Sequence, residues 1–298
     1  MGTQQLLTQE FAGFVVEEFG DSVLDGDVTN CMTDTSSIDS NGESEHPDFN
    51  ESSTTIPETR GDQRSAFEDA AEAIAGGESA RPSDTAPFGS EIGNLEEWAH
   101  RQGALISDTA FDCLDTVSNS TSEHEVFYRP VDSRAVKRTW AGVYGQIPHA
   151  ANGKLDRRNA SPSEYLRRMA LHISVFGSDL KLEGVTISSK PSMIIGQPAG
   201  QPSIVISQRW YEREGLASNE AIHQMLVDEG FRPVPSSYFG WYRPTDGSVI
   251  VDAKPDNFIQ TREGLIPIDL QMAQFTPEQL KTAGLTSDPS APVIFIPR

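Results

Sequence analysis

The acidic side chains of this 298-residue chain are concentrated near its start, and this limits where a folded core can form. Residues 1–90 carry 19 acidic and three basic side chains, a net charge of −16, whereas the whole chain carries −21. Residues 20–90 are rich in Ser, Thr, Asp, Glu, Gly and Pro, and such a composition buries too little apolar surface to offset the entropy of folding. We therefore expect residues 1–90 to be mostly disordered, with short helices at most at 4–19 and 64–75, and residues 91–298 to form the folded domain.

Composition also argues against several classes of protein. The acidic segment would repel nucleic acid phosphates, and the sequence has no run of about 18 apolar residues that could span a membrane. The two cysteines, Cys31 and Cys113, are far apart and have no His or Cys neighbour at metal-ligand spacing. We expect a protein of the reducing cytoplasm, without a zinc site and without nucleic acid or membrane partners.

The stretch VDAKPDNFIQTREGLIPIDLQ, residues 251–271, predicts a β-hairpin with polar side chains at its open end. Two short apolar runs, residues 258–260 and 265–268, flank a four-residue polar loop that ends at Gly264. In an antiparallel hairpin the start of the first strand lies beside the end of the second. Asn257, just before the hairpin, and Asp269, just after it, should therefore be neighbours in space.

A second hairpin is expected immediately upstream. Residues 238–243 and 248–251 flank the turn Pro-Thr-Asp-Gly, which would deliver Asp252 to the same point as Asn257 and Asp269. A carboxylate and an amide oxygen suit Mg²⁺, and the remaining carboxylate could accept a proton from a hydroxyl group. Phosphoryl transfer requires this combination, because one group orients the attacking hydroxyl while oxygen ligands hold metal on the phosphates.

The segment D-A-K-P-D-N, residues 252–257, resembles the catalytic loop D-x-K-x-x-N of protein kinases, and Asp269 lies where their metal-binding D-F-G motif would fall. Two departures are clear, because Ile-Val replaces the usual His-Arg before the loop and Leu-Gln replaces the Phe-Gly after the second Asp. The resemblance implies that Asp252 accepts the proton of the acceptor hydroxyl and that Lys254 neutralises charge on the transferring phosphoryl group. It also implies that Asn257 and Asp269 bind Mg²⁺.

A kinase further needs a strand lysine for the nucleotide phosphates and a helix glutamate that pairs with it. Residues 126–128 and 134–137 predict two strands, and Lys137 follows Ala-Val as in the V-A-I-K motif. A helix opens at Ser161, where Glu164 completes a capping box. The resemblance makes Lys137 a phosphate ligand and Glu164 its ion-pair partner, and a purely capping role for Glu164 is the alternative.

The resemblance also assigns the rest of a nucleotide site. Residues 117–122 correspond to the phosphate-binding loop; they contain no Gly, but small side chains such as Ser120 and Ser122 could still turn and offer backbone N–H groups. The strand predicted at 202–211 would lead to the hinge that reads adenine, which makes Gln208 a further candidate contact. His124 lies near the loop and could contact phosphate. The expected cofactors are ATP and Mg²⁺.

Three further helices are expected outside these motifs. Asn94 can cap a helix that runs from Leu95 and ends at Gly103. Residues 218–230 form a capped pattern, and residues 276–281 could make one short helix.

Residues from about 95 to 275 resemble one family in particular, the protein-kinase-like domain found in polyvalent proteins of phages and conjugative elements. The matching segments include AVKRT, SPSEYLRRMALHISVFGSDLKLEGV and VDAKPDNFIQTREGLIPIDLQ. The resemblance implies an α+β fold with a minimal kinase-like arrangement of two lobes, an N-lobe over about 91–207 and a truncated C-lobe over about 208–298. It also implies phosphorylation of Ser, Thr or Tyr in an unknown protein substrate, in the cytosol of a bacterium or of a phage-infected host.

Three functions remain open on the sequence alone. Only 29 residues follow Asp269, too few for the substrate-docking helices of a full kinase C-lobe, so either the domain is minimal or the chain is part of a larger polyvalent protein. The first function is an ATP–Mg²⁺ kinase of protein hydroxyls, and the second is a small-molecule phosphotransferase of the aminoglycoside-kinase type. The third is a pseudokinase that serves as an interaction module.

Overall fold

The computed structural model describes residues 60–76, 87–118, 123–188, 199–235, 237, 239–286 and 288. The chain divides into two units, Met1–Glu45 and His46–Arg298, and every described residue belongs to the second. Several expectations lie outside the described residues: the helix within 4–19, the disorder from residue 20 to 59, and the candidate phosphate ligands Ser120 and Ser122.

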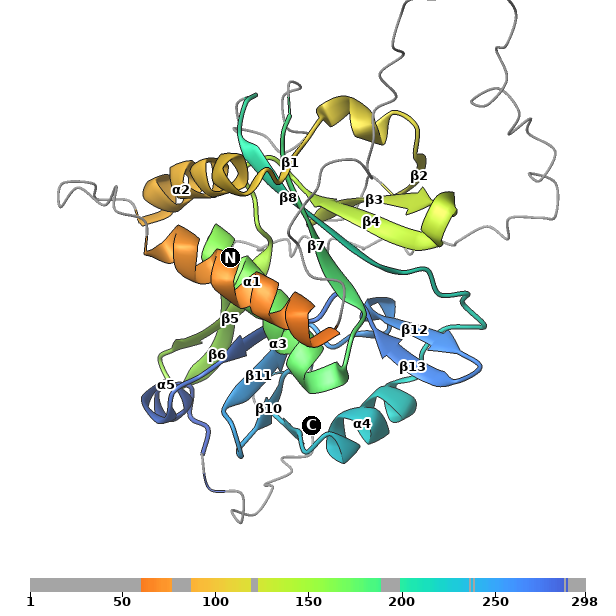
Figure 1. Cartoon of the computed structure of the whole chain (residues 1–298). Helices are drawn as coiled ribbons and strands as arrows, with labels where there is room; N and C mark the ends of the chain where they lie inside the picture. The colour runs from red at the N-terminus through yellow and green to blue at the C-terminus, as the bar shows by residue number, and fades with distance from the viewer. Residues whose placement is uncertain are drawn as a thin grey trace, which may run out of the picture. The chain divides into compact units, whose positions relative to one another are not determined.

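A mixed six-stranded sheet forms the first half of the described fold (Figure 1). Its strands follow the order β1-β7-β8-β4-β3-β2, and the β1–β7 pair is parallel while the other pairs are antiparallel. The strands predicted at 126–128, 134–137 and 202–211 are confirmed as β3, β4 and β8, and the mixed α+β class is confirmed with them. The strand bounds are β1 Leu105–Ile106, β2 Asp115–Ser118, β3 His124–Arg129, β4 Arg134–Thr139, β7 Leu180–Ile187 and β8 Pro202–Arg209.

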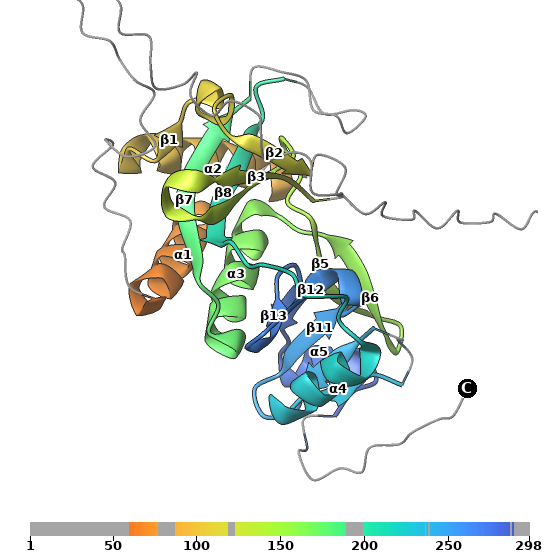
Figure 2. The same ribbon diagram turned by 90° about the vertical axis from the view of Figure 1, so that its right-hand side faces the viewer.

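Three helices pack together beside this sheet: α1 (Arg60–Ala75), α2 (Pro87–Gln102) and α3 (Pro162–Phe176). Figures 1 and 2 show α1 lying along α3. Helix α3 begins as predicted, because the Ser161 hydroxyl accepts the Glu164 N–H and the Glu164 carboxylate accepts the Ser161 N–H. Apolar side chains of all three helices share one buried core with β7 and β8.

Helix α1 changes the expected domain boundary. Phe67 and Ile74 are fully buried in the core shared with α3, although only a local helix without a core role was expected at residues 64–75. The described fold therefore includes Arg60–Ala75, which lies on the N-terminal side of the boundary expected near residue 90. Composition was misleading because Phe67, Ala70, Ala71 and Ile74 are few, yet their spacing of three and four places them all on one helix face.

Helix α2 also starts earlier than expected, at Pro87 rather than near Leu95. Asn94 is consequently not its N-cap: the buried amide nitrogen of Asn94 donates to the carbonyl oxygen of Ile74 at 2.7 Å, in the last turn of α1. The side chain thereby satisfies one of the carbonyl groups that a helix end leaves unpaired. The other end of α2 agrees with the sequence, because Gly103 follows it with a left-handed φ of 63°.

A four-stranded antiparallel sheet forms the second half, in the order β14-β11-β10-β9. Two further strands, β12 and β13, form a separate hairpin, which α4 contacts. Both hairpins predicted in this region are confirmed as β10–β11 and β12–β13, the second with a two-residue turn instead of four. The bounds are β9 Arg232–Pro233, β10 Trp241–Arg243, β11 Ser248–Val251, β12 Phe258–Thr261, β13 Gly264–Pro267, β14 Gln271–Gln274, α4 Asn219–Asp228 and α5 Pro277–Thr282.

A hairpin that was not predicted connects the two halves. Strands β5 (Gln146–Ala151) and β6 (Lys154–Asn159) follow β4 in the chain but pair only with each other. Leu155 joins an apolar cluster with Val249 of β11 and Leu280 of α5, and the Gly153 N–H donates to the Thr282 carbonyl oxygen at 3.0 Å. The β5–β6 hairpin is therefore anchored on the second half, as Figure 1 shows.

Candidate functional site

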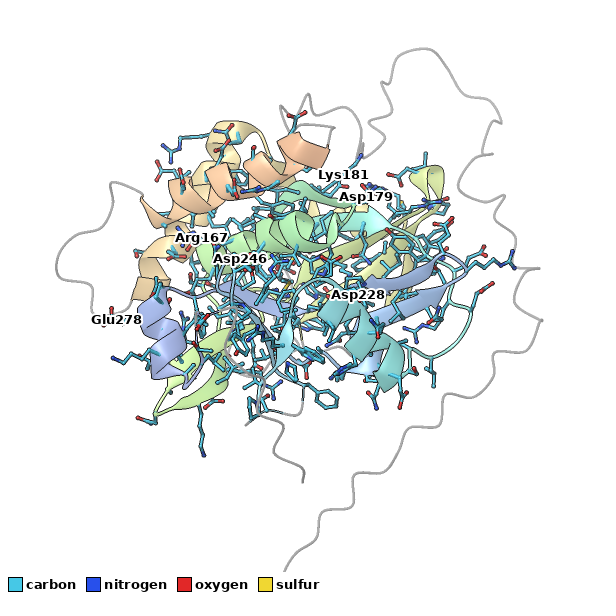
Figure 3. The ribbon with its side chains drawn as sticks, turned by 90° about the horizontal axis from the view of Figure 1, so that it is seen from below. Arg167, Asp179, Lys181, Asp228, Asp246 and Glu278 are labelled. Carbon is cyan, nitrogen blue, oxygen red and sulfur yellow. The ribbon has the colours of Figure 1, made fainter. Side chains whose placement is uncertain are left out.

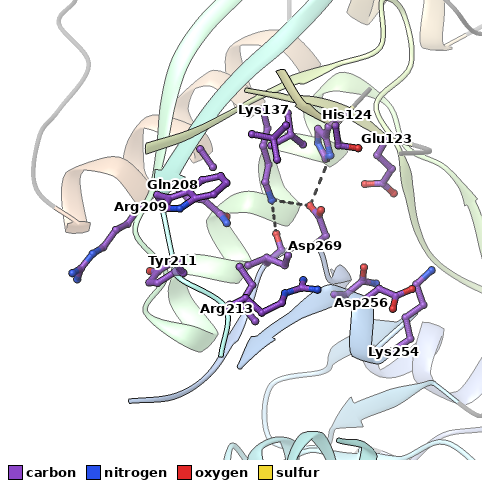
Figure 4. A pocket seen from close by; sticks show the side chains of 18 of the residues that line it. Glu123, His124, Lys137, Gln208, Arg209, Tyr211, Arg213, Lys254, Asp256 and Asp269 are labelled. Atoms are coloured by element: carbon purple, nitrogen blue, oxygen red, sulfur yellow. Dashed lines mark hydrogen bonds and ion pairs between the residues drawn. The ribbon is translucent and has the colours of Figure 1, made fainter. Parts of the chain in front are cut away.

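A cavity of about 600 Å³ lies between β3, β4 and β8 of the six-stranded sheet and the loops that follow β11 and β13. Its lining includes residues from both halves of the fold (Figure 4). Six of the nine site residues predicted from the sequence line it: Lys137, Gln208, Asp252, Lys254, Asn257 and Asp269. The volume falls within the usual range for small-molecule and cofactor sites.

The loop after β11 is a tight turn around Asp252. This residue has a left-handed φ of 61°, a conformation that residues other than Gly rarely adopt. The amide nitrogen of Asn257 donates to the Asp252 carbonyl oxygen at 2.6 Å and to Asp252 Oδ2 at 3.2 Å. Lys254 Nζ lies 3.4 Å from the same Oδ2. The turn therefore gathers an acid, a base and an amide within one short segment.

The β12–β13 hairpin brings Asp269 beside Asn257, as the position of its open end predicts. The Ile268 N–H donates to the Asn257 carbonyl oxygen at 3.0 Å, which continues the pairing of the hairpin by one step. Because the amide nitrogen of Asn257 is engaged with Asp252, its amide oxygen is the atom left to face a cation. The convergence of Asp252, Asn257 and Asp269 on one cavity is thereby confirmed.

Lys137 reaches the same point from β4, although it lies 132 positions away from Asp269 in the chain. Its side chain is almost fully buried. Nζ donates to the Ile268 carbonyl oxygen at 2.9 Å and to Asp269 Oδ1 at 3.1 Å (Figure 4). One ammonium group thus connects the central strand of the first sheet to the loop that carries the second acid.

Asp269 lies in the electrostatic field of Lys137, Arg168 and His124. Burial would by itself raise its pKa, but Lys137, His124 and Arg168 together lower the pKa below the usual value of an Asp carboxyl. The carboxylate is therefore ionised at neutral pH. Its positive partner is Lys137, which it contacts directly.

His124 is a neutral member of the site. Its Nε2 lies 2.9 Å from the Tyr165 hydroxyl, and its Nδ1 lies 3.8 Å from Asp269 Oδ1. Burial lowers its pKa to about 4, against the opposite effect of Asp269 and Glu123. The side chain is 2 % exposed and nevertheless lines the cavity, so a phosphate contact there would involve an uncharged ring at neutral pH.

The predicted ion pair between Lys137 and Glu164 is wrong. Glu164 pairs with Arg158 of β6 and with the N-terminus of α3, and Lys137 pairs with Asp269. The carboxylate of Glu164 is held at the first turn of α3 by its capping box, which leaves it outside the lining of the cavity. The alternative expectation, that Glu164 is a capping acid, is the correct one.

A buried ion pair that the sequence did not reveal reaches the cavity, because its acid, Glu123, is one of the lining residues. Arg168 of α3 donates to Glu123 through both terminal nitrogens, at 2.6 and 3.3 Å, and is fully buried. Glu123 also accepts the side chain of Gln271 at 3.1 Å. Burial would raise the pKa of Glu123, but Arg168 and His124 lower it. The signal in the sequence is an arginine between Tyr165 and Met169, on the apolar face of α3.

A second cavity, of about 540 Å³, lies along α3 next to α1, β5 and β14. Its lining is charged but mostly self-neutralised, because Arg64 pairs with Glu68 and Arg158 pairs with Glu164. Arg167 and Asp246, labelled in Figure 3, also line it. None of the site residues predicted for the cofactor or the reaction lines this second cavity except Glu164, so we assign no chemistry to it.

Comparison with known proteins identifies no relative, because no family model, no curated protein and no solved structure matches the chain. Two kinds of feature are absent from the described residues. They contain no helix that is both long and apolar enough to cross a membrane. They contain no group of three or more His, Cys, Asp or Glu side chains arranged to hold a metal ion.

Proposed function

We propose that the 600 Å³ cavity binds ATP with Mg²⁺ and transfers the terminal phosphoryl group to a hydroxyl group of a protein. The observation that carries this proposal is the meeting of Lys137, Asp252 and Asp269 in one cavity, from segments far apart in the chain. A cation for phosphate, a carboxylate for the acceptor proton and oxygen ligands for metal are the parts that phosphoryl transfer needs. The resemblance to the kinase-like domain of polyvalent proteins agrees with it, and an origin in a phage or conjugative element belongs to the same proposal.

The finer fold that goes with this function is a minimal kinase-like arrangement of two lobes. The six-stranded sheet with α3 would be the N-lobe, and the four-stranded sheet with α4 would be a short C-lobe. Two features support this assignment. The segments follow one another in the order β3–β4, α3, β7–β8, α4 and the acid-bearing loops, and the cavity lies between the two sheets.

Apolar side chains on opposite walls would hold the nucleotide base. Val126 and Ala135 line the cavity on the sheet side, and Ile259 and Ile268 line it on the side of the β12–β13 hairpin. A flat ring between these walls would leave its edge facing the backbone near Gln208, where β8 ends. The phosphates would then extend towards Lys137, whose charge is already positioned by Asp269.

The donor set fits a hard divalent cation. Asp269 Oδ atoms and the amide oxygen of Asn257 are oxygen ligands, and Mg²⁺ is commonly held by one or two protein ligands together with phosphates and water. When bound, Mg²⁺ would neutralise charge on the phosphate oxygens. Asp269 would need to release Lys137 from one of its oxygens, and the freed ammonium would bind phosphate.

Asp252 would act on the acceptor. Its carboxylate would take the hydroxyl proton as the acceptor oxygen forms a bond to the terminal phosphorus, while the bond from that phosphorus to the bridging oxygen breaks and ADP leaves. Lys254, 3.4 Å from Asp252, would stabilise negative charge on the transferring group. The left-handed turn at Asp252 supports this role, because strained backbone is often found where a side chain must be aimed.

A second candidate function is a pseudokinase, and one observation favours it. Lys137 and Asp269 already pair with each other, so the two groups that would hold phosphate and metal are both occupied. A small-molecule phosphotransferase shares the chemistry of the first proposal and differs from it only in the acceptor.

Calorimetry and phosphate transfer together test these functions. The full-length protein is titrated with ATP in the presence and absence of Mg²⁺, and is then incubated with labelled ATP and a mixture of bacterial proteins. We expect binding that depends on Mg²⁺ and label in protein. Asp269→Asn should abolish the metal-dependent part of nucleotide binding, whereas the matched change Asp228→Asn, on the exposed end of α4, should leave it intact.

Each other outcome selects a different function. Nucleotide binding without transfer to any acceptor, the protein itself included, would support the pseudokinase. Transfer to metabolites but not to proteins would support the small-molecule enzyme. Absence of nucleotide binding in the wild-type protein would refute the protein kinase and the small-molecule enzyme and would leave the pseudokinase.

A further inference from the structure

The β5–β6 hairpin places a positively charged side chain beside Asp252, and no motif in the sequence indicates this contact. Arg157 of β6 places its Nη1 3.5 Å from Asp252 Oδ1. The backbone of the hairpin is anchored to the second half of the fold, because Leu155 shares an apolar cluster with Val249 and the Gly153 N–H donates to the Thr282 carbonyl oxygen. Arg157 thus occupies a defined place relative to the proposed catalytic acid.

The two oxygens of Asp252 have different surroundings. Oδ2 accepts the amide of Asn257 and faces Lys254, so it belongs to the turn itself. Oδ1 faces Arg157. A hydroxyl group that gives its proton to Asp252 would therefore approach Oδ1, and its neighbouring atoms would pass next to the guanidinium.

The guanidinium of Arg157 retains most of its hydrogen-bonding capacity. A distance of 3.5 Å to Oδ1 is longer than a normal charge-assisted hydrogen bond, and the side chain is 47 % exposed. A guanidinium carries five N–H donors in a fixed fork, which suits a carboxylate or a phosphate better than it suits one distant oxygen. The neighbouring Arg158, by contrast, already donates two hydrogen bonds to the Glu164 carboxylate.

We propose that Arg157 selects the acceptor by binding an anionic group, carboxylate or phosphate, that lies close to the reacting hydroxyl. This inference rests on the proposed phosphoryl transfer at Asp252 and adds its acceptor class. Acceptors would be Ser or Thr beside Asp, Glu or phosphoserine in a protein, or a phosphorylated hydroxy compound if the acceptor is small. Arg157 is then a specificity-determining residue, and neutral acceptors are poor ones.

Matched acceptors and matched variants test the proposal. One pair consists of short peptides with a single Ser that is flanked either by Glu or by Gln, and the other consists of glycerol 3-phosphate and glycerol. The variants are Arg157→Ala, Arg157→Lys and the control Lys154→Ala, which removes one positive charge from an exposed position of the same hairpin. ATP–Mg²⁺ affinity is measured for each variant by calorimetry and should be unchanged, because Arg157 is not part of the nucleotide site.

In at least one of the two acceptor pairs, we expect the wild-type protein to use the charged member about tenfold or more better than the neutral member, as judged by kcat/KM. This is the scale of one charge-assisted hydrogen bond. Arg157→Ala should raise the KM for the charged acceptor about tenfold with a smaller change in kcat, Arg157→Lys should recover part of the loss, and Lys154→Ala should behave as wild type. The pair that shows the preference, peptide or glycerol compound, identifies the source of the anion.

Three results would overturn the inference while leaving the proposed function intact: equal use of charged and neutral acceptors, equal losses in Arg157→Ala and Lys154→Ala, or faster transfer to all acceptors in Arg157→Ala. If the wild-type protein transfers no phosphate, the proposed function fails. The anion site is then tested separately, by measuring binding of the fluorescently labelled Glu-flanked peptide in the presence of ADP–Mg²⁺ by fluorescence anisotropy. Binding that is lost only in Arg157→Ala would support the anion site, and binding that is absent or equal in all variants would refute it.

Discussion

Lys137 and Asp269 form the central contact of the site, and it has a consequence for metal binding. The ammonium group lies 3.1 Å from Asp269 Oδ1, where it occupies one of the oxygens that a metal ion would use. Lysine and metal therefore compete for the same carboxylate until phosphate provides a second partner for the lysine. Nucleotide and metal should bind with positive cooperativity, because each relieves the competition that opposes the other.

Lys137→Met should separate the two roles of this ammonium group, competition with metal for Asp269 and binding of phosphate. Removing the ammonium group eliminates the competitor, so the affinity for Mn²⁺ or Mg²⁺ without nucleotide should rise about tenfold, while ATP affinity falls by a similar factor. Metal titrations by calorimetry, with and without ATP, measure both. The control Lys154→Met changes the same charge on an exposed strand. An unchanged metal affinity in Lys137→Met would contradict the competition.

The roles proposed for Asp252 and Lys254 predict a separation of binding from turnover. Asp252→Ala should bind ATP–Mg²⁺ almost normally, because the reacting hydroxyl is its partner, and should lose about 100-fold or more in kcat, the scale of a general base. Lys254→Ala should also lose turnover, since it acts on charge in the transition state. Labelled-phosphate kinetics beside calorimetry measure the two properties, and undiminished transfer by Asp252→Ala would exclude its role.

Residues predicted correctly at this scale share a local origin. Asp252, Asn257 and Asp269 meet because both hairpins are encoded within residues 241–267, so turn chemistry suffices to bring them together. The Glu123–Arg168 pair lies 45 positions apart, and the partner of Lys137 lies 132 positions away. Such contacts depend on how whole elements pack, which sequence periodicity alone does not specify.

At the scale of elements, α3 is fixed to the site through Arg168. The fully buried guanidinium is paired with Glu123, and the cost of leaving one of these charges alone is large. Arg168→Met should therefore destabilise the fold by about 3–5 kcal/mol, whereas the double variant Glu123→Leu with Arg168→Met should recover much of that loss. Urea unfolding of the single and double variants measures the difference.

The neighbouring Arg167 provides the control for this cycle. It is exposed on the same helix, so Arg167→Met should change the free energy of unfolding by no more than about 0.5 kcal/mol. If the double variant is no more stable than Arg168→Met alone, the loss comes from packing of the arginine stem and not from the unpaired charge.

Elements with strong local signals were predicted, and those without them were missed. The capped helix α3 and the hairpin β12–β13 follow from a capping box and a turn. Strand β6 is missed because Leu155 is its one buried residue, which leaves no alternating pattern. Strand β7 does alternate, but Gly184 interrupts it with a bulge, where an added Cβ would lie 2.2 Å from the Ala104 carbonyl oxygen.

At the scale of the whole molecule, α1 is part of the folded core rather than of a dispensable segment. Phe67 is fully buried against the core, so Phe67→Ala should cost about 3–5 kcal/mol in the free energy of unfolding. A protein that starts at residue 91 lacks the whole helix and should lose its cooperative melt, whereas one that starts at residue 50 should keep it. Differential scanning calorimetry tests both, and a cooperative transition in the shorter protein would restore the boundary near residue 90.

Stability of the whole molecule should also fall on mild acidification because His172 is buried as a neutral ring. Burial, with smaller effects of Lys137 and Arg168, lowers its pKa from 6.5 to about 3. The unfolded chain therefore binds a proton below pH 6.5 that the folded protein does not, so stability is intact above that pH and declines as the pH falls towards 3. This residue alone should contribute a slope approaching about 1.4 kcal/mol per pH unit between pH 6 and 5.

His172→Asn should reduce the measured slope of unfolding free energy against pH by that amount, and the exposed control His100→Asn should leave the slope unchanged. Equal slopes in the wild-type protein and in His172→Asn would show that the ring becomes protonated without unfolding the protein.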